Sequence, residues 1–409
     1  MPADFPSRLR AFAGVIVRVG LNLQRGQRLL IAEPYDLQGV ARSAEVIVDA
    51  VRVAATAAGC PAVEVLWGDG ARLREYALNQ DWRGFGQLTD DNARRMQDYL
   101  GNHDALLFLQ GSQPNLLEGI PAAAVAKLRR IGWENFGPIA QQLMQGETNW
   151  TVAPAPSPGW AHAVYGDLPT EQRLAALWDV VFEALRIPVE GRSPADGGPS
   201  GEWPSSIQAW RSHLIALQEY RDDLNARRLK SVHYQGNGTD LTLSLPPEHL
   251  WCSAQLVTKS GVSFVANLPT EEVFTLPHRD SAEGKVRVSR PINYGGARIE
   301  GIEIIFERGV AVHASATAHE ALLHQLLDTD AGAGRLGEVA LVLRETTLAR
   351  ARRLFHHPLL DENASNHIAL GDAYGFCLRL PDPGAINHSL IHVDLPLDAR
   401  VTLSKLEPP

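Results

Sequence analysis

The sequence predicts an α/β protein of two domains, an N-terminal domain with a mainly parallel sheet and flanking helices and a C-terminal α+β domain. The chain has 409 residues, of which 45% are hydrophobic, so it can bury more than one core. Short apolar runs alternate with Ala-rich helical stretches over residues 1–200, and this alternation is typical of βα units around a parallel sheet. After residue 229 the pattern changes to strands joined by turn residues. We therefore expect domains at 1–200 and 201–409.

The predicted N-terminal elements follow this alternation along the chain. Strands are predicted at the apolar runs RLLIAE, AVEVLWGD and DALLFLQG, near residues 30, 65 and 107, and a helix at ARSAEVIVDAVRVAATAAG lies between the first two. A further helix over 169–187 begins at Pro169 and Thr170, has an acid in its first turn and ends at Pro188. Residues 188–206 are dense in Pro, Gly and Ser, which predicts a linker between the domains or a surface insertion.

The C-terminal elements begin with a long helix over 207–229. Gly236, Asn237 and Gly238 then separate two alternating runs, which predicts a β-hairpin. Further strands are expected in VRVSRPINY, IEGIEIIFERGVAVHASA and EVALVLRE, with a helix at TAHEALLHQLLD. The motif GxGxxG at 332–337 follows that helix and precedes a strand, the reverse of a dinucleotide site, so we interpret it as a turn.

Composition and charge exclude several classes of function. The formal net charge of -9 provides no basic surface for nucleic acid. The three cysteines form no CxxC pair, which disfavours a disulfide framework and a thiolate zinc site. The apolar N-terminal stretch is interrupted by Arg18 and lacks a cleavage site, and no window is long enough to span a membrane. The sequence therefore predicts a soluble cytoplasmic protein without nucleic-acid or membrane partners.

Acids and histidines gather in four segments of the second half. In ANLPTEEVFT, residues 266–275, Glu271 and Glu272 precede a β-prone run, and at most one of them can point into a given site because successive strand residues face opposite sides. In LGEVALV, residues 336–342, Glu338 lies at the edge of an apolar strand. Taken alone, each of these acids is more typical of a solvated surface charge than of a site.

The other two segments add imidazoles. LLDENASNHIALGDAYG, residues 359–375, contains Asp361, Glu362, His367, Asp372 and Tyr374. In INHSLIHVDLPLD, His392 and Asp394 are two apart in a β-like run and share a face, a combination that suits zinc, cobalt, manganese or iron, although such a pair alone is more often hydrogen-bonded. Motifs GxSxG and HExxH are absent from the sequence. A carboxylate-rich set with few histidines is more typical of two-metal hydrolases than of single-zinc proteases.

Together and in order, these segments resemble the thermophilic-type metallo-aminopeptidases, which include aminopeptidase T, aminopeptidase S and PepS. The similarity runs over nearly the whole chain, from GLNLQRGQRLLI and YDLQGVARSAEVIVDAV through GTDLTLSL to HSLIHVD. It implies a two-domain α/β protein, a homodimer, and a dinuclear metal site in the C-terminal domain. The implied activity is hydrolysis of N-terminal residues from peptides that have a free N-terminus.

The resemblance also assigns roles to individual residues. It implies two divalent ions per chain, zinc, cobalt or manganese, held by Glu272, Glu338, His367, His392 and Asp394. Tyr374 matches the family's catalytic tyrosine, whose phenol suits stabilisation of an oxyanion. We expect Glu338 to act also in catalysis as the bridging carboxylate, and Glu271 to support a ligand or serve as a base.

The sequence departs from the family at Ser365 and Asn366, in the run LPLDARV after Asp394, and in the segment 188–206. None of these changes removes a ligand, but residues beside the ligands shape substrate preference. Two alternatives stay open: a mononuclear iron dioxygenase that cleaves dihydroxypyridine rings, and a non-catalytic binding protein on the same scaffold. Both are disfavoured, because all five ligand positions hold competent ligands and Tyr374 accompanies them.

Overall fold

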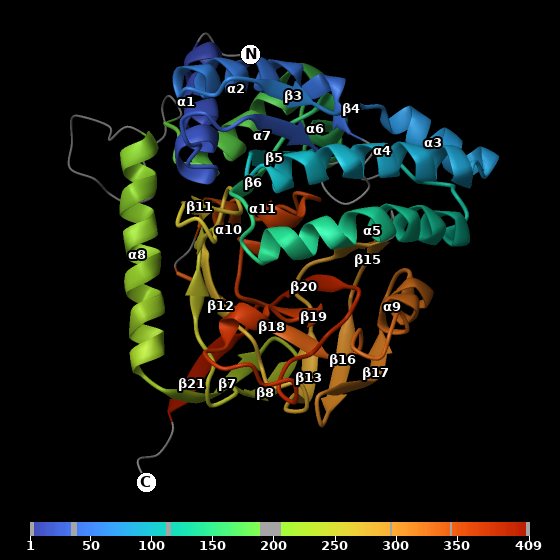
Figure 1. Ribbon diagram of the computed structural model, residues 1–409. Helices are drawn as coiled ribbons and strands as arrows, with labels where there is room; N and C mark the ends of the chain where they lie inside the picture. Colours follow the sequence, from blue (N-terminus) through green and yellow to red (C-terminus); the bar gives the residue numbers. More distant parts are fainter. Residues whose placement is uncertain are drawn as a thin grey trace. The chain divides into compact units, whose positions relative to one another are not determined.

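The computed structural model describes residues 4–33, 39–111, 116–188, 206–294, 297–343 and 346–405. The chain divides into two compact units, the first formed by residues 1–213 and 255–270 and the second by 214–254 and 271–409 (Figure 1). The division falls within helix α8 (Ser206–Ala226). Most of the predicted linker, together with the predicted boundary at residue 200, lies outside the described residues, since 189–205 are not described.

The first unit is built on a parallel sheet, as the sequence predicts. Its strand order is β3-β1-β5-β6, and every pair is parallel. The strands are β1 (Leu29–Ala32), β3 (Val63–Val65), β5 (Ala105–Gln110) and β6 (Trp150–Pro154). The residues of β1 and nearly all of those of β5 are buried, as expected for central strands covered on both faces. Strand β6 is not among the sequence predictions.

Helices and short strand pairs complete the first unit. The helices are α1 (Phe5–Val15), η1 (Ile16–Gly20), η2 (Arg42–Ala44), α2 (Glu45–Ala57), α3 (Gly70–Asn79), α4 (Trp82–Gly101), α5 (Ala122–Met144), α6 (Pro158–Val164) and α7 (Thr170–Ala184). The short strands are β2 (Val40–Ala41), β4 (Trp67–Gly68), β10 (Gln255–Val257) and β11 (Ser263–Val265). Helix α7 begins at the predicted residue. Of the helices in the described part of the chain, none has the length and apolar character that crossing a bilayer requires.

The second unit contains two larger antiparallel sheets. The six-stranded sheet has the order β17-β16-β13-β8-β7-β21 and the five-stranded sheet the order β20-β19-β18-β12-β9. The first is formed by β7 (Leu229–Gly236), β8 (Thr239–Ser244), β13 (Glu283–Arg287), β16 (Glu303–Glu307), β17 (Val310–Ser315) and β21 (Arg400–Lys405). The second is formed by β9 (Cys252–Ser253), β12 (Glu272–Thr275), β18 (Leu336–Val342), β19 (His367–Gly371) and β20 (His392–Pro396).

The remaining elements of this unit are short: β14 (Ile292–Tyr294), β15 (Ala297–Ile299), α9 (Glu320–Leu327), α10 (Thr347–Arg350), α11 (Pro358–Glu362) and η3 (Gly375–Cys377). Burial alternates along β8, so the six-stranded sheet buries one face, whereas β18 and β19 are buried on both faces. The predicted hairpin is confirmed between β7 and β8, where Asn237 and Gly238 adopt positive φ angles of 48° and 88°. The GxGxxG motif is confirmed as a helix-to-strand turn: Gly332 and Gly334 lie between α9 and β18, and Gly337 lies at the start of β18.

Candidate metal centre

Four neighbouring strands of the five-stranded sheet bring the predicted ligands to one face. Directly opposite residues of an antiparallel pair share a face, and so do residues two apart along a strand. Glu338, Ala369 and Asp394 lie opposite one another across β18, β19 and β20. The other opposed pairs are Ala340 with His367, Gly371 with His392, and Val342 with Glu272. The five side chains therefore point the same way, and the small side chain of Ala369 lies between those of Glu338 and Asp394.

A β-bulge at Gly337 sets this arrangement. Leu336 lies opposite Leu370 but Glu338 lies opposite Ala369, so one extra residue enters β18. Without that shift, Glu338 would face Ile368, whose side chain points to the other side of the sheet. A Cβ at Gly337 would lie 2.3 Å from the carbonyl oxygen of Asp372, so only glycine fits the bulge. The last glycine of the GxGxxG motif therefore has a structural role in aiming Glu338.

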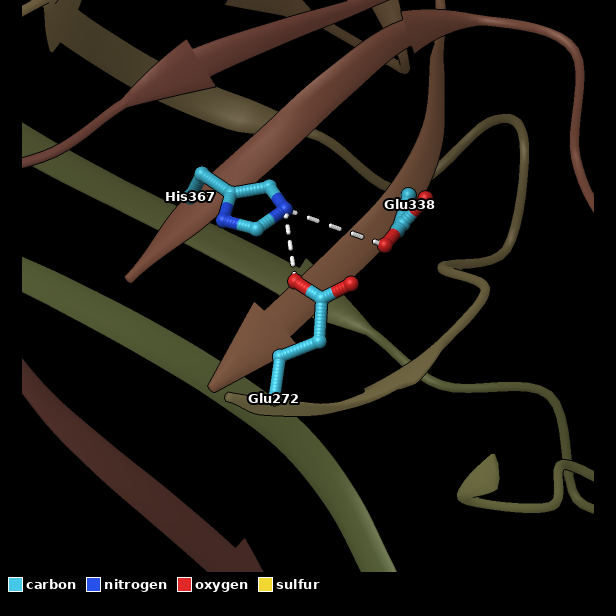
Figure 2. A group of neighbouring side chains, drawn as sticks. All are labelled: Glu272, Glu338 and His367. Atoms are coloured by element: carbon cyan, nitrogen blue, oxygen red, sulfur yellow. Dashed lines mark ion pairs between the residues drawn. The ribbon is translucent and has the colours of Figure 1, made fainter. Parts of the chain in front are cut away.

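The site has a buried end and a more accessible end. At the buried end, His367 Nε2 lies 3.1 Å from Glu272 Oε2 and 3.9 Å from Glu338 Oε1 (Figure 2). At the other end, His392 Nε2 lies 3.0 Å from Glu338 Oε2 and 3.4 Å from Asp394 Oδ1. The side chain of His367 is 1% exposed, whereas those of His392 and Asp394 are 24% and 22% exposed. Glu338 lies between the two ends and is buried, although an acid at a strand edge is more often exposed.

Backbone carbonyls orient both imidazoles. His367 Nδ1 is 3.2 Å from the carbonyl oxygen of Ser365, and His392 Nδ1 is 2.9 Å from that of Asp372. A proton on Nδ1 in each ring satisfies these contacts and leaves Nε2 directed at the carboxylates. This arrangement is the one by which proteins fix a histidine for metal binding through Nε2.

Electrostatics hold protons on the two imidazoles when no cation is bound. Burial by itself lowers the pKa of His367, but the carboxylates of Glu272, Asp394 and Glu338 outweigh it and raise that pKa to about 10. The pKa of His392 is also raised well above its usual range, because Asp394 and Glu338 outweigh its burial. Metal binding through Nε2 requires the neutral rings, so it must displace these protons.

The carboxylates respond to the same pairing in different ways. Burial raises the pKa of Glu338, and the neighbouring imidazoles offset only part of that effect. Burial by itself raises the pKa of Asp394 as well. The hydrogen bond to His392 and the charges of the two imidazoles outweigh it and lower the pKa of Asp394 to about 2. Asp394 therefore stays ionised over the whole physiological range.

The donor set fits divalent cations. Two groups of three offer ligand atoms within 4.8 Å of one another: Glu272, Glu338 and His367, and Glu338, His392 and Asp394. Glu272 Oε2 is buried and faces His367 Nε2 at 3.1 Å. Buried carboxylate oxygens and imidazole nitrogens that converge in this way are expected where a cation binds between them. Oxygen and imidazole nitrogen ligands suit zinc, cobalt and manganese.

Tyr374 lies beside the accessible end. Its ring centroid is 5.0 Å from that of His392, and the ring stacks on Phe376 at 5.4 Å and meets Phe274 edge-on at 5.8 Å. The residue precedes the turn η3 and is partly buried. Packing on three sides therefore fixes the plane of the phenol next to one ligand.

Glu362, at the end of α11, is a neighbour of the site to which the sequence assigned no role. Burial, Asp394 and Glu272 together raise the pKa of Glu362 well above its usual range. Its Oε1 accepts a hydrogen bond of 3.2 Å from Asn363 Nδ2. The sequence feature that could have pointed to Glu362 is its position in the acid-rich segment before His367. Glu271 belongs to neither group of three, and its backbone N–H donates to Asn363 Oδ1 at 2.6 Å.

Known proteins resemble this chain over most of its length. The family model of Thermophilic metalloprotease (M29) matches residues 5–402. Aminopeptidase T of Thermus thermophilus is 38% identical over 95% of this chain and 92% of its own, and aminopeptidase AmpS of Bacillus subtilis is 34% identical over 97% and 94%. The solved structure of wild-type AmpT from Thermus thermophilus matches with a TM-score of 0.85 and 36% identity, covering 98% of this chain and 96% of that chain.

These similarities confirm the predicted family, the predicted α/β fold and the predicted class of enzyme. The matched segment includes every residue of the site described above. The family description calls for a metal, and the second unit supplies two groups of residues able to hold one. The chain therefore belongs to the thermophilic metalloprotease family and is a metal-dependent hydrolase of peptide bonds of the aminopeptidase type.

Proposed function

We propose that the chain removes N-terminal residues from peptides at a dinuclear metal centre. One ion would be held by Glu272, Glu338 and His367 and the other by Glu338, His392 and Asp394. The observation that carries the proposal is that Glu338 belongs to both groups, with Oε1 directed at His367 and Oε2 directed at His392. A carboxylate whose two oxygens face different groups of ligands is suited to bridge two cations. Glu338 is therefore the proposed bridging residue.

The bound ions would supply Lewis acidity that polarises the scissile carbonyl, lowers the pKa of a water molecule and anchors the free amine of the substrate. We assign proton transfer to Glu362 rather than to Glu271. The carboxyl of Glu362 has a raised pKa and hydrogen-bonds to the ionised Asp394, so it carries a proton that it can donate to the leaving amine. Its bond from Asn363 holds it in place.

Tyr374 is assigned to the oxyanion. Its ring is fixed beside His392, so its hydroxyl can donate a hydrogen bond to the negatively charged oxygen that forms at the scissile carbonyl. The backbone bonds to Nδ1 of both histidines keep Nε2 directed inward through the reaction.

We also propose that the enzyme is a homodimer, because an exopeptidase must admit chain ends and exclude the middle of a chain. Light scattering at the concentration of the assay tests this. A monomer that retains full activity would contradict it.

The metal centre is tested by metal analysis after gentle dialysis and by turnover under nitrogen. We expect about two divalent ions per chain, loss of activity on chelation, and release of N-terminal residues from short peptides by the zinc or cobalt form without oxygen. Acetylating the peptide amine should abolish release because the amine can no longer be anchored. A stoichiometry that never exceeds one, with full activity, would rule out the dinuclear centre.

The same experiment tests the alternative oxygenase chemistry. Redox-inert zinc can support hydrolysis, whereas ring cleavage requires iron that activates dioxygen. If no divalent metal supported peptide turnover and the iron form consumed oxygen with a hydroxylated pyridine, the proposal would be replaced by a dioxygenase function.

A further inference from the structure

Two cysteines that are distant in the sequence are in contact in the second unit. The Sγ atoms of Cys252 and Cys377 are 3.6 Å apart although 125 positions separate the two residues. Cys252 belongs to β9, at the edge of the five-stranded sheet, and Cys377 ends the turn η3. Both are free thiols, as is Cys60. A disulfide has a sulfur–sulfur distance of about 2.0 Å, so closing the pair requires an approach of only about 1.6 Å.

The two thiols differ in the way that a reactive and a resolving cysteine differ. Cys252 is partly exposed, whereas Cys377 is buried. The Cys377 thiol donates a hydrogen bond to the Cys252 sulfur. That bond, with help from the positive charge of Arg221, lowers the pKa of Cys252 even though burial opposes the effect. Thiolate character and access both favour oxidation at Cys252 first.

The pair is connected to the catalytic region through short segments. Cys252 lies opposite Phe274 on β12, two residues beyond the proposed ligand Glu272. The backbone N–H of Cys377 donates to the carbonyl oxygen of Tyr374 at 2.9 Å. Phe274 and Tyr374 are in ring contact and pack against the apolar cluster that contains Cys377. Drawing Cys377 toward Cys252 must therefore displace the turn that positions Tyr374.

We propose that Cys252 and Cys377 form a peroxide-sensitive modification site whose oxidation to a disulfide lowers turnover. The Cys252 thiolate attacks one oxygen of hydrogen peroxide and the O–O bond breaks. Cys252 becomes a sulfenic acid, and the other oxygen leaves as hydroxide, which takes up the proton that Cys252 lost on ionising and becomes water. The Cys377 sulfur then attacks the Cys252 sulfur, the S–O bond breaks, and the departing hydroxide takes the Cys377 proton to form a second water. Two thiols are oxidised and one peroxide is reduced. The effect on turnover rests on the proposed role of Tyr374.

The test uses the zinc-loaded protein with Cys60→Ser, so that no third thiol reacts. After treatment with hydrogen peroxide, we expect the intact mass to fall by two hydrogens and non-reducing peptide mapping to show Cys252 linked to Cys377. Turnover should fall about tenfold or more, the scale expected when a catalytic group is displaced by a fraction of an ångström. Zinc content should not change, and dithiothreitol should restore activity.

Two variants establish the order of the steps. With Cys377→Ser, Cys252 should stop at the sulfenic acid and be trapped by dimedone. With Cys252→Ser, peroxide should leave both the mass and the turnover unchanged. Failure to form the Cys252–Cys377 link, at peroxide concentrations that oxidise N-acetylcysteine fully, would overturn the site. A complete link with unchanged turnover would overturn the coupling to Tyr374. Because the mass measurement detects the disulfide without relying on activity, both outcomes can be told apart from a failure of the proposed function.

Discussion

Replacing Tyr374 by phenylalanine removes one hydroxyl and leaves the packing of the ring in place. The ring contacts with Phe274, Phe376 and His392 involve carbon atoms that both side chains share. We therefore expect the free energy of unfolding to change by no more than about 1 kcal/mol. Metal content should be unchanged, because Tyr374 belongs to neither group of ligands.

The effect on catalysis should be far larger than the effect on stability. Loss of one oxyanion donor costs about 2.7–4 kcal/mol in the transition state, which corresponds to a kcat lowered by roughly two to three orders of magnitude. KM should change little, since the charge on the oxygen develops only after the substrate has bound. Steady-state kinetics on a short peptide with the zinc form measure kcat and KM, metal analysis measures the metal content, and thermal unfolding measures the stability.

Tyr234→Phe is the matched control. Tyr234 is fully buried on β7 in the same unit, and its hydroxyl has no hydrogen-bond partner among the described residues. Its removal should leave kcat unchanged and should not destabilise the fold. If Tyr374→Phe turned over like the wild type, or if both variants lost activity equally, the oxyanion role would be wrong and Tyr374 would be a packing residue.

Three further predictions concern the carboxylates and protons of the site. Glu338→Gln should abolish turnover and reduce bound zinc to one ion or fewer by metal analysis, because an amide bridges cations poorly; two retained ions would contradict bridging. Glu362→Gln should retain metal but lower kcat by roughly 10²–10⁴-fold, whereas the control Glu271→Gln should not, and equal kinetics would refute the assignment. The pKa of about 10 for His367 means that metal binding below that pH should release a proton and tighten as pH rises, as calorimetry in buffers of different ionisation enthalpy can measure. In the metal-free protein the same raised pKa adds stability that is present below the unfolded value of 6.5 and is lost as pH rises through about 10.

Local sequence patterns were sufficient for the fold class and for several elements. The continuous apolar runs at β1 and β5 predict strands covered on both faces, and burial confirms them. Asn237 and Gly238 tolerate positive φ, so the hairpin could be placed from the local sequence alone. Strand β6 was missed because its short run is interrupted by the polar Thr151 and ends at Pro154, whereas β1 and β5 are continuous apolar runs. The segments identified the family because several motif matches that occur in the same order along the chain are far more specific than any single match.

Residue types and short-range periodicity were thus sufficient to predict the family, the fold class and a set of candidate acids and histidines. Which of these side chains come together depends on strand register and packing. Burial of Glu338 depends on the bulge at Gly337 and on strand pairing with β19, and the proximity of Glu362 to Asp394 depends on where α11 packs. The contact between Cys252 and Cys377 likewise joins residues 125 positions apart. Strand register and non-local packing are set by hydrogen bonds between distant segments, and local periodicity does not encode them.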